Sequence, residues 1–203
     1  MNKLKKIIIL PLLLLMSAAT AQNVKVLKLG DSAPLTDLKV SDVSGRSLSL
    51  AEAAGNNGLM VVFSCNTCPW VAKWEDRYNG LAELASQNGI GMIALNPNER
   101  IRNRGESMDD MKKRAQKSGY NFSYALDKDH KLADAFGATR TPEVFLFNGD
   151  MKLVYHGAID DNANDANAVE SKYAADAITM MIAGSAITDP ETRSLGCTIK
   201  RVE

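Results

Sequence analysis

The sequence of 203 residues is poor in the side chains that hold metals or staple small domains, with three cysteines and two histidines. A closed zinc site normally takes four ligands, drawn from two Cys or His clusters. Only one close pair, Cys65 and Cys68, is present, so we expect no such site. A disulfide staple is also disfavoured, because a domain of this size can build its own core and a bridge over so short a loop adds little stability.

The sequence also lacks a charge imbalance, internal repeats and a linker-like segment. Lys and Arg number 24, and so do Asp and Glu. A balanced surface has no long-range attraction for nucleic acid or for an anionic membrane, so we expect neither as a partner. The chain length and the absence of a low-complexity tract that would separate two domains predict one domain.

Long apolar runs are absent except near the N-terminus. Three lysines precede the apolar run 7–16, and small residues follow it up to Ala21. The run contains Pro11 and is much shorter than the roughly 20 residues that span a bilayer, so a cleavable signal peptide is favoured over a membrane anchor. We expect a signal peptide over 1–21, cleaved after Ala21, and a periplasmic or secreted domain over 22–203. That domain would carry 21 basic and 24 acidic residues, a net charge of −3, with no membrane attachment.

Apolar periodicity and turn residues predict strands that alternate with helices. Such an order favours an α/β fold, with a mixed central sheet covered by helices on both faces. The expected strands are 38–43, 47–50, 59–63, 90–95, 122–126, 143–147 and 152–156. The expected helices are 49–55, 70–84, 107–119, 131–136 and 171–183, followed by an extended tail.

The stretch VVFSCNTCPWV places Cys65 and Cys68 between a buried strand and a long helix. The free amides and the dipole at a helix start favour a thiolate over a thiol, which makes a cysteine there nucleophilic at neutral pH. Pro69 suits the first helical turn, where a missing amide costs little. The position therefore favours a redox-active pair.

Metal binding remains an alternative in one form, a copper site made by the two cysteines and one histidine. His130 lies in a charged run and His156 ends an expected strand, so both are more typical of surface residues. The acidic loop 160–165 lacks the glycine and the closing glutamate of a calcium loop, and we expect it to be solvated. We therefore expect no metal and no other cofactor.

A second signal lies far from the cysteines, where Thr141-Pro142 precedes an apolar strand. With it, the chain resembles the thioredoxin-like redoxins, of the alkyl hydroperoxide reductase/thiol-specific antioxidant type, and within them a peroxiredoxin-like subgroup with a Cys-x-x-Cys-Pro motif. The resemblance covers nearly the whole domain and rests on these segments: 30–34 (GDSAP), 63–71 (FSCNTCPWV), 75–77 (EDR), 141–142 (TP), 145–147 (FLF), 157–161 (GAIDD) and 196–200 (GCTIK).

The resemblance implies a thioredoxin-like fold in which the peptide before Pro142 is cis and faces the cysteines. Thr141 would then offer its backbone to an incoming chain, so Thr141 and Pro142 are the expected substrate-binding residues. The helix from Ser107 and the strand from Phe122 would form the redoxin-type insertion. The sequence departs from thioredoxin in having Ser64 before the first cysteine, and no acid in the preceding strand to relay protons.

The chemistry predicted from these residues is thiol-disulfide exchange with thiol- or disulfide-bearing proteins, in cell redox homeostasis, with a further redox partner to recycle the pair. We expect Cys65 to be the more exposed thiol and to attack, and Cys68 to resolve the mixed disulfide. A thiol peroxidase with antioxidant activity is an alternative, in which Cys68 reacts. Cys197 is either an inert thiol in a docked tail or a third redox thiol beside the site.

Overall fold

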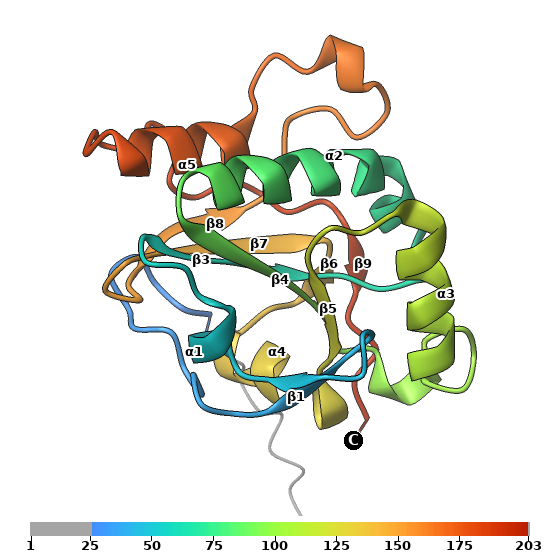
Figure 1. Ribbon diagram of the computed structural model, residues 1–203. Helices are drawn as coiled ribbons and strands as arrows, with labels where there is room; N and C mark the ends of the chain where they lie inside the picture. The colour runs from blue at the N-terminus through green and yellow to red at the C-terminus, as the bar shows by residue number, and fades with distance from the viewer. Residues whose placement is uncertain (1–25, 203) are drawn as a thin grey trace, which may run out of the picture.

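The computed structural model describes residues 26–202, so the expected signal peptide lies outside the described residues. A mixed sheet forms the centre of the fold (Figure 1). Its strands are β1 (Val40–Asp42), β2 (Ser47–Leu48), β3 (Gly58–Phe63), β4 (Ile90–Asn96), β5 (Ser123–Leu126), β7 (Glu143–Asn148) and β8 (Leu153–Gly157). Two strand sets, β2-β1-β5-β4 and β3-β7-β8, meet where the Ser64 amide donates to the Leu95 carbonyl at 2.8 Å.

Strand directions are mixed, as the sequence predicts. Strands β4 and β5 are parallel, whereas β3 and β7 are antiparallel over their whole length and β7 returns through a hairpin to β8. The parallel pair needs a crossover connection, and the chain between β4 and β5 supplies it with a helix. This connection is the expected redoxin-type insertion.

Helices cover both faces of the sheet. They are α1 (Leu50–Ala53), α2 (Pro69–Gln87), α3 (Met108–Ser118), α4 (Lys131–Phe136) and α5 (Tyr173–Ile182), with short 3-10 turns η1 (Glu99–Ile101), η2 (Lys128–His130) and η3 (Ala166–Ala168). Figure 1 shows α2 and α5 on one face and α1 and α4 on the other, with α3 beside the β5 end. Within the described residues, none of the helices has the length and apolarity needed to cross a bilayer.

Strand β3 is buried on both sides, which explains its uninterrupted apolar sequence. Met60 and Val62 contribute to the apolar cluster under α2, which includes Trp74 and Tyr78. The alternate residues of β3 pack into the opposite cluster with α4, where Phe63 meets Phe136 edge to face at 5.4 Å between ring centroids. The strand that leads to the cysteines is therefore fixed from both faces.

Local signals placed most helix ends correctly. Ser49 and Ser107 both form capping boxes at the starts of α1 and α3. Gly119 and Gly137 follow α3 and α4 in the left-handed conformation that favours glycine. These four residues lie at the ends of the helices expected over 49–55, 107–119 and 131–136.

The C-terminal tail is more ordered than its sequence indicated. It contributes β9 (Cys197–Thr198), which pairs antiparallel with β6 (Arg140–Thr141), a two-residue strand directly before Pro142. Strands this short show no periodicity, so the sequence predicted only an extended tail. The pairing brings Cys197 of the tail opposite Thr141, which contacts both cysteines of the pair.

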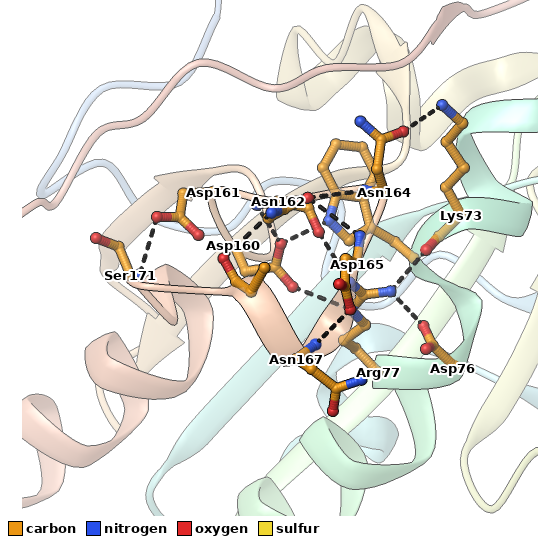
Figure 2. A network of polar contacts seen from close by, with 12 residues as sticks. Lys73, Asp76, Arg77, Asp160, Asp161, Asn162, Asn164, Asp165, Asn167 and Ser171 are labelled. Atoms are coloured by element: carbon orange, nitrogen blue, oxygen red, sulfur yellow. Dashed lines mark hydrogen bonds and ion pairs between the residues drawn. The ribbon is translucent and has the colours of Figure 1, made fainter.

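The loop expected to be solvated is partly buried (Figure 2). Asp160 is 5 % exposed. Its carboxylate accepts from the Trp74 indole at 2.9 Å and from the Arg77 guanidinium at 3.1 Å, both on α2. The solvated-loop prediction is therefore wrong for Asp160, because a buried carboxylate needs partners and α2 supplies them. The result ties α2 to the segment that follows β8.

Candidate active site

The two cysteines lie in the connection from β3 to α2. Cys68 is the N-cap residue of α2, and Pro69 occupies the first turn, as expected. Cys65 is 1 % exposed and Cys68 is 5 % exposed. The expectation that Cys65 is the exposed thiol is therefore wrong, because Thr141 lies against its sulfur and the segment after Cys65 is tied down by hydrogen bonds.

Both sulfur atoms meet the same residue of β6. The Cys65 Sγ lies 3.2 Å from Thr141 Oγ1, and the Cys68 Sγ lies 3.3 Å from Thr141 O. The Thr141–Pro142 peptide is cis, as the resemblance implies. The fold thus brings together residues more than seventy positions apart in sequence.

The pKa values of the two thiols are shifted in opposite directions. A hydrogen bond from the Cys65 thiol is the largest cause that lowers the pKa of Cys68 to about 5, and a contact with Cys197 adds to it. The same bond, together with burial and the nearby Glu106, raises the pKa of Cys65. A helix N-terminus favours the anion at Cys68 in the same direction. At a pH above the pKa of Cys68, its thiolate accepts a hydrogen bond from the Cys65 thiol, and at lower pH the Cys68 thiol donates to the Thr141 carbonyl.

Glu106 is a site residue that sequence reasoning missed. Its side chain is fully buried, and its carboxyl oxygens accept from the backbone amides of Asn66 and Thr67 at 2.8 and 3.0 Å. The Thr67 hydroxyl and the Asn96 amide also donate to it, at 2.6 and 2.7 Å. Glu106 fixes the two residues between the cysteines, and it supplies an acid near Cys65 that the preceding strand lacks. It lies in a loop before α3, and no motif marked it.

Glu143 and His156 support the backbone before Pro142. Glu143 accepts from the amides of Thr139 and Arg140 at 2.7 and 2.9 Å, and its other oxygen lies 2.8 Å from His156 Nε2. His156 is thus a partly buried partner of Glu143, with 15 % of its side chain exposed, and not the plain surface residue expected. This arrangement fixes the strand that carries Thr141.

The copper alternative has no support in the site geometry. His156 contacts Glu143, and His130 pairs with Asp134 at 2.7 Å. Across residues 26–202, no group of three or more His, Cys, Asp or Glu side chains is placed to hold a metal ion.

Cys197 lies at the same site. It faces Thr141 in the register of β6 and β9, and the carbonyl of that same Thr141 lies 3.3 Å from the Cys68 Sγ; the neighbouring Cys68 contributes to raising the pKa of Cys197. Cys197 is half-buried, and all three cysteines are free thiols. The edge of Thr141 that the resemblance offers to an incoming chain is therefore occupied by this chain's own tail.

A thiol pair at the start of a helix, facing a cis-proline strand on a mixed sheet, defines the class of thioredoxin-like redoxins. Residues 29–156 match the AhpC/TSA family. This match covers more than half of the chain, and the chain belongs to that family.

Three known proteins are similar to this chain over most of its length. It is 26 % identical over 132 residues to the thiol-disulfide oxidoreductase ResA of Geobacillus thermodenitrificans, covering 64 % of this chain and 70 % of ResA. A crystal structure of an uncharacterized conserved protein from Geobacillus kaustophilus superposes with a TM-score of 0.80 and 29 % identity, over 86 % of this chain and 93 % of that one. A crystal structure of a hypothetical protein from Sinorhizobium meliloti 1021 superposes with a TM-score of 0.77 and 28 % identity, over 88 % of this chain and 97 % of that one. The chain is thus related to redox proteins over most of its length.

Proposed function

We propose that this protein is a thiol-disulfide oxidoreductase that uses Cys65 and Cys68 as its redox pair and exchanges disulfides with partner proteins. The observation that carries the proposal is the contact of both sulfur atoms with Thr141, beside a cis-proline and at the start of α2. A relative named as a thiol-disulfide oxidoreductase supports the same activity.

We propose roles for the two cysteines that are the reverse of those expected from sequence. We assign attack to Cys68, because its pKa is the lower of the two and its side chain is the less buried. The thiolate attacks a disulfide sulfur, one S–S bond forms, and the partner's other sulfur leaves as a thiolate and takes up a proton. Cys65 then loses its proton, attacks the Cys68 sulfur and releases the second partner thiol. A separate redox partner would return the pair to the dithiol.

Thr141 and Pro142 form the wall of the site against which these sulfurs react. We propose that they position the reacting disulfide and that the contact of Cys65 with the Thr141 hydroxyl orients the resolving thiol. The side chain of Thr141 is fully buried, so its role is positioning within the protein.

A thiol peroxidase is the second candidate, and the lowered pKa of Cys68 beside Pro69 favours it. The two activities separate in one comparison of reduced wild-type protein with insulin and with hydrogen peroxide, each followed by stopped-flow or turbidity. We expect catalysis of insulin reduction in the presence of a dithiol and a reaction with peroxide no faster than that of a free thiol. Rapid peroxide oxidation with no insulin reduction would replace the proposal by the peroxidase.

We also propose that the protein is exported and that residues 1–21 are removed. The charged start and the short apolar run of that segment support this. N-terminal sequencing of protein purified from the exported fraction should begin at Gln22. Recovery of chains that begin at Met1 from the cytosolic fraction alone would contradict it.

A further inference from the structure

The redox pair of this protein is shielded from partner proteins. Cys65 and Cys68 are 1 % and 5 % exposed, and a disulfide carried by a folded partner has to reach a sulfur atom in line with its S–S bond. Cys197, which is half-buried, is the most accessible of the three thiols. The exchange activity proposed above therefore needs either a route past the tail or a thiol that carries the exchange outward.

The tail is held too firmly to act as a loose cover. The Ile199 amide donates to the Thr139 carbonyl at 3.0 Å, and the Arg100 amide donates to the Lys200 carbonyl at 2.9 Å. The Lys200 amide donates to the Asn98 side chain at 2.9 Å, and Arg201 donates to Asp134 at 2.7 Å. Ile199 is itself part of the core. Releasing the tail would break all of these contacts, so we favour a route that keeps it in place.

Gly196 sets the position of the neighbouring thiol. A Cβ atom at this residue would lie 2.4 Å from the Thr141 carbonyl oxygen and 3.0 Å from the Pro142 nitrogen. Only glycine lets the tail pass this close to the site. Arg140 donates to the Gly196 carbonyl at 3.0 Å and fixes the crossing from the other strand. The crossing places Cys197 opposite Thr141, whose carbonyl also contacts Cys68.

We propose that Cys197 is a third redox residue, through which the Cys65/Cys68 pair exchanges disulfides with partner proteins. This inference rests on the proposed oxidoreductase function and refines it: Cys197 makes the first attack on the partner's disulfide, and Cys68 attacks the resulting Cys197–partner disulfide. In the reductive direction, Cys197 attacks the partner's disulfide while its proton passes to the adjacent Cys68 thiolate. A Cys197–partner bond forms, and the first partner sulfur leaves as a thiolate.

The following steps conserve atoms and electrons. Cys68 gives its proton to the released partner thiolate and attacks the Cys197 sulfur, so that a Cys68–Cys197 disulfide forms and the second partner thiolate leaves. Cys65 transfers its proton to that thiolate and attacks Cys68, which produces the Cys65–Cys68 disulfide and frees Cys197, to be reprotonated by solvent. The partner disulfide gains two electrons and the Cys65/Cys68 dithiol loses them. Every step is reversible, so oxidation of a partner follows the same path backward.

The acidities of the thiols are consistent with this path. Burial and the contact with Cys68 raise the pKa of Cys197 to about 11, so it attacks only with the help of a base, and the Cys68 thiolate is in contact with it. In the reverse direction Cys68 is a good leaving group because its pKa is low. Attack by a partner thiol is then directed to the more exposed Cys197 sulfur.

The first test asks whether the intermediate bridge forms. Cys65→Ser and Cys68→Ser each keep two thiols, and each is oxidised with glutathione disulfide and mapped by mass spectrometry. We expect a Cys68–Cys197 bridge in Cys65→Ser, and only glutathione adducts in Cys68→Ser. Glutathionylated Cys68 with free Cys197 in the first variant would overturn the proposal.

The second test measures the route to a protein substrate. Cys197→Ser should lose insulin reduction by about tenfold or more, because exchange by an adjacent thiol is replaced by a rare opening of the tail. Gly196→Ala should lose a similar factor, because the added Cβ moves Cys197 away from Thr141 and Cys68. Both should still form the Cys65–Cys68 bridge on oxidation. Gly196→Ala keeps all three thiols but displaces the tail, and Thr198→Ala, at an exposed position of β9, is the matched control with wild-type rates.

The outcomes separate the two proposals. Insulin reduction at the wild-type rate by Cys197→Ser overturns the role of Cys197 and leaves the oxidoreductase intact. If Cys65→Ser forms the Cys68–Cys197 bridge but the wild-type protein reduces no protein disulfide, the internal exchange is supported and the proposed function is overturned.

Discussion

Cys68→Ala is expected to reduce disulfide exchange to the uncatalysed level and to remove the one thiolate that the reduced protein holds at neutral pH. Cys68 is an acid whose pKa in the folded protein, about 5, lies below the ordinary thiol value. Its thiolate is therefore present above pH 5 and is lost as the pH falls through that value. The substitution removes the contribution of Cys68 to the raised pKa values of Cys65 and Cys197, but burial still raises both, so neither thiol replaces the Cys68 thiolate.

The measurement is the rate of iodoacetamide labelling from about pH 4 to about pH 9, with the labelled residue identified by mass spectrometry. In the wild type we expect Cys68 to be labelled, with a midpoint near pH 5 and a plateau above it. In Cys68→Ala the rate should keep rising into alkaline solution. The shape of the profile is the signal, because a lower pKa also lowers intrinsic nucleophilicity and partly offsets the rate.

Two variants of the neighbouring cysteine control this experiment. Cys65→Ala removes the hydrogen bond that is the largest cause of the low pKa of Cys68, so the labelling midpoint should move up toward the free-thiol value of about 8.5. Cys65→Ser keeps a hydrogen-bond donor to Cys68 and should move the labelling midpoint less. A low-pH midpoint that maps to Cys65 would restore the assignment expected from sequence, and a Cys68 midpoint that is unchanged in Cys65→Ala would contradict the Cys65 hydrogen bond as the cause of the low pKa.

Glu106→Ala should destabilise the protein more than any other single change at the site. It removes the acceptor of the partly buried Asn66 and Thr67 amides and of one of the two amide hydrogens of the buried Asn96 side chain. Such losses typically sum to about 3–5 kcal/mol of the free energy of unfolding. Urea unfolding of the reduced protein measures it.

Glu106→Gln separates the charge from the packing. It keeps the size of the side chain and one acceptor oxygen, so the loss should be smaller, at about 1–2 kcal/mol. The pKa of Cys65 should also fall, because Glu106 contributes to raising it. Glu83→Ala, at an exposed position of α2, is the matched control and should lie within about 0.5 kcal/mol of the wild type. A Glu106→Ala loss no larger than that of the control would contradict the role assigned to this carboxyl.

Most of the fold could be predicted from local patterns. Strand β3 and helices α1, α3 and α4 lie where the sequence placed a strand and three helices, with Ser49, Ser107, Gly119 and Gly137 at the helix ends. Each of these signals acts over a few residues, so a single sequence contains it. The AhpC/TSA match agrees with the family that the cysteine and proline motifs had indicated.

Burial at the site could not be predicted in the same way. Position at a strand end suggested an exposed Cys65, yet Thr141 lies against its sulfur and leaves it 1 % exposed. Glu106 carries no motif, because its partners are backbone amides about forty residues away. The sequence predicted a solvated Asp160, but its carboxylate accepts hydrogen bonds from Trp74 and Arg77 of α2.

The sequence by itself determined the order of strands and helices, the place of the Cys-x-x-Cys-Pro motif at a strand-to-helix junction, and Thr141-Pro142 as the second landmark. Only the tertiary structure decided which thiol is the anion and where Cys197 lies. The physical reason is that acidity and access depend on atoms brought together from distant segments: the Cys65 hydrogen bond, the start of α2 and the pairing of β9 with β6. A two-residue strand has no pattern of its own, and its place at the site follows from what it pairs with.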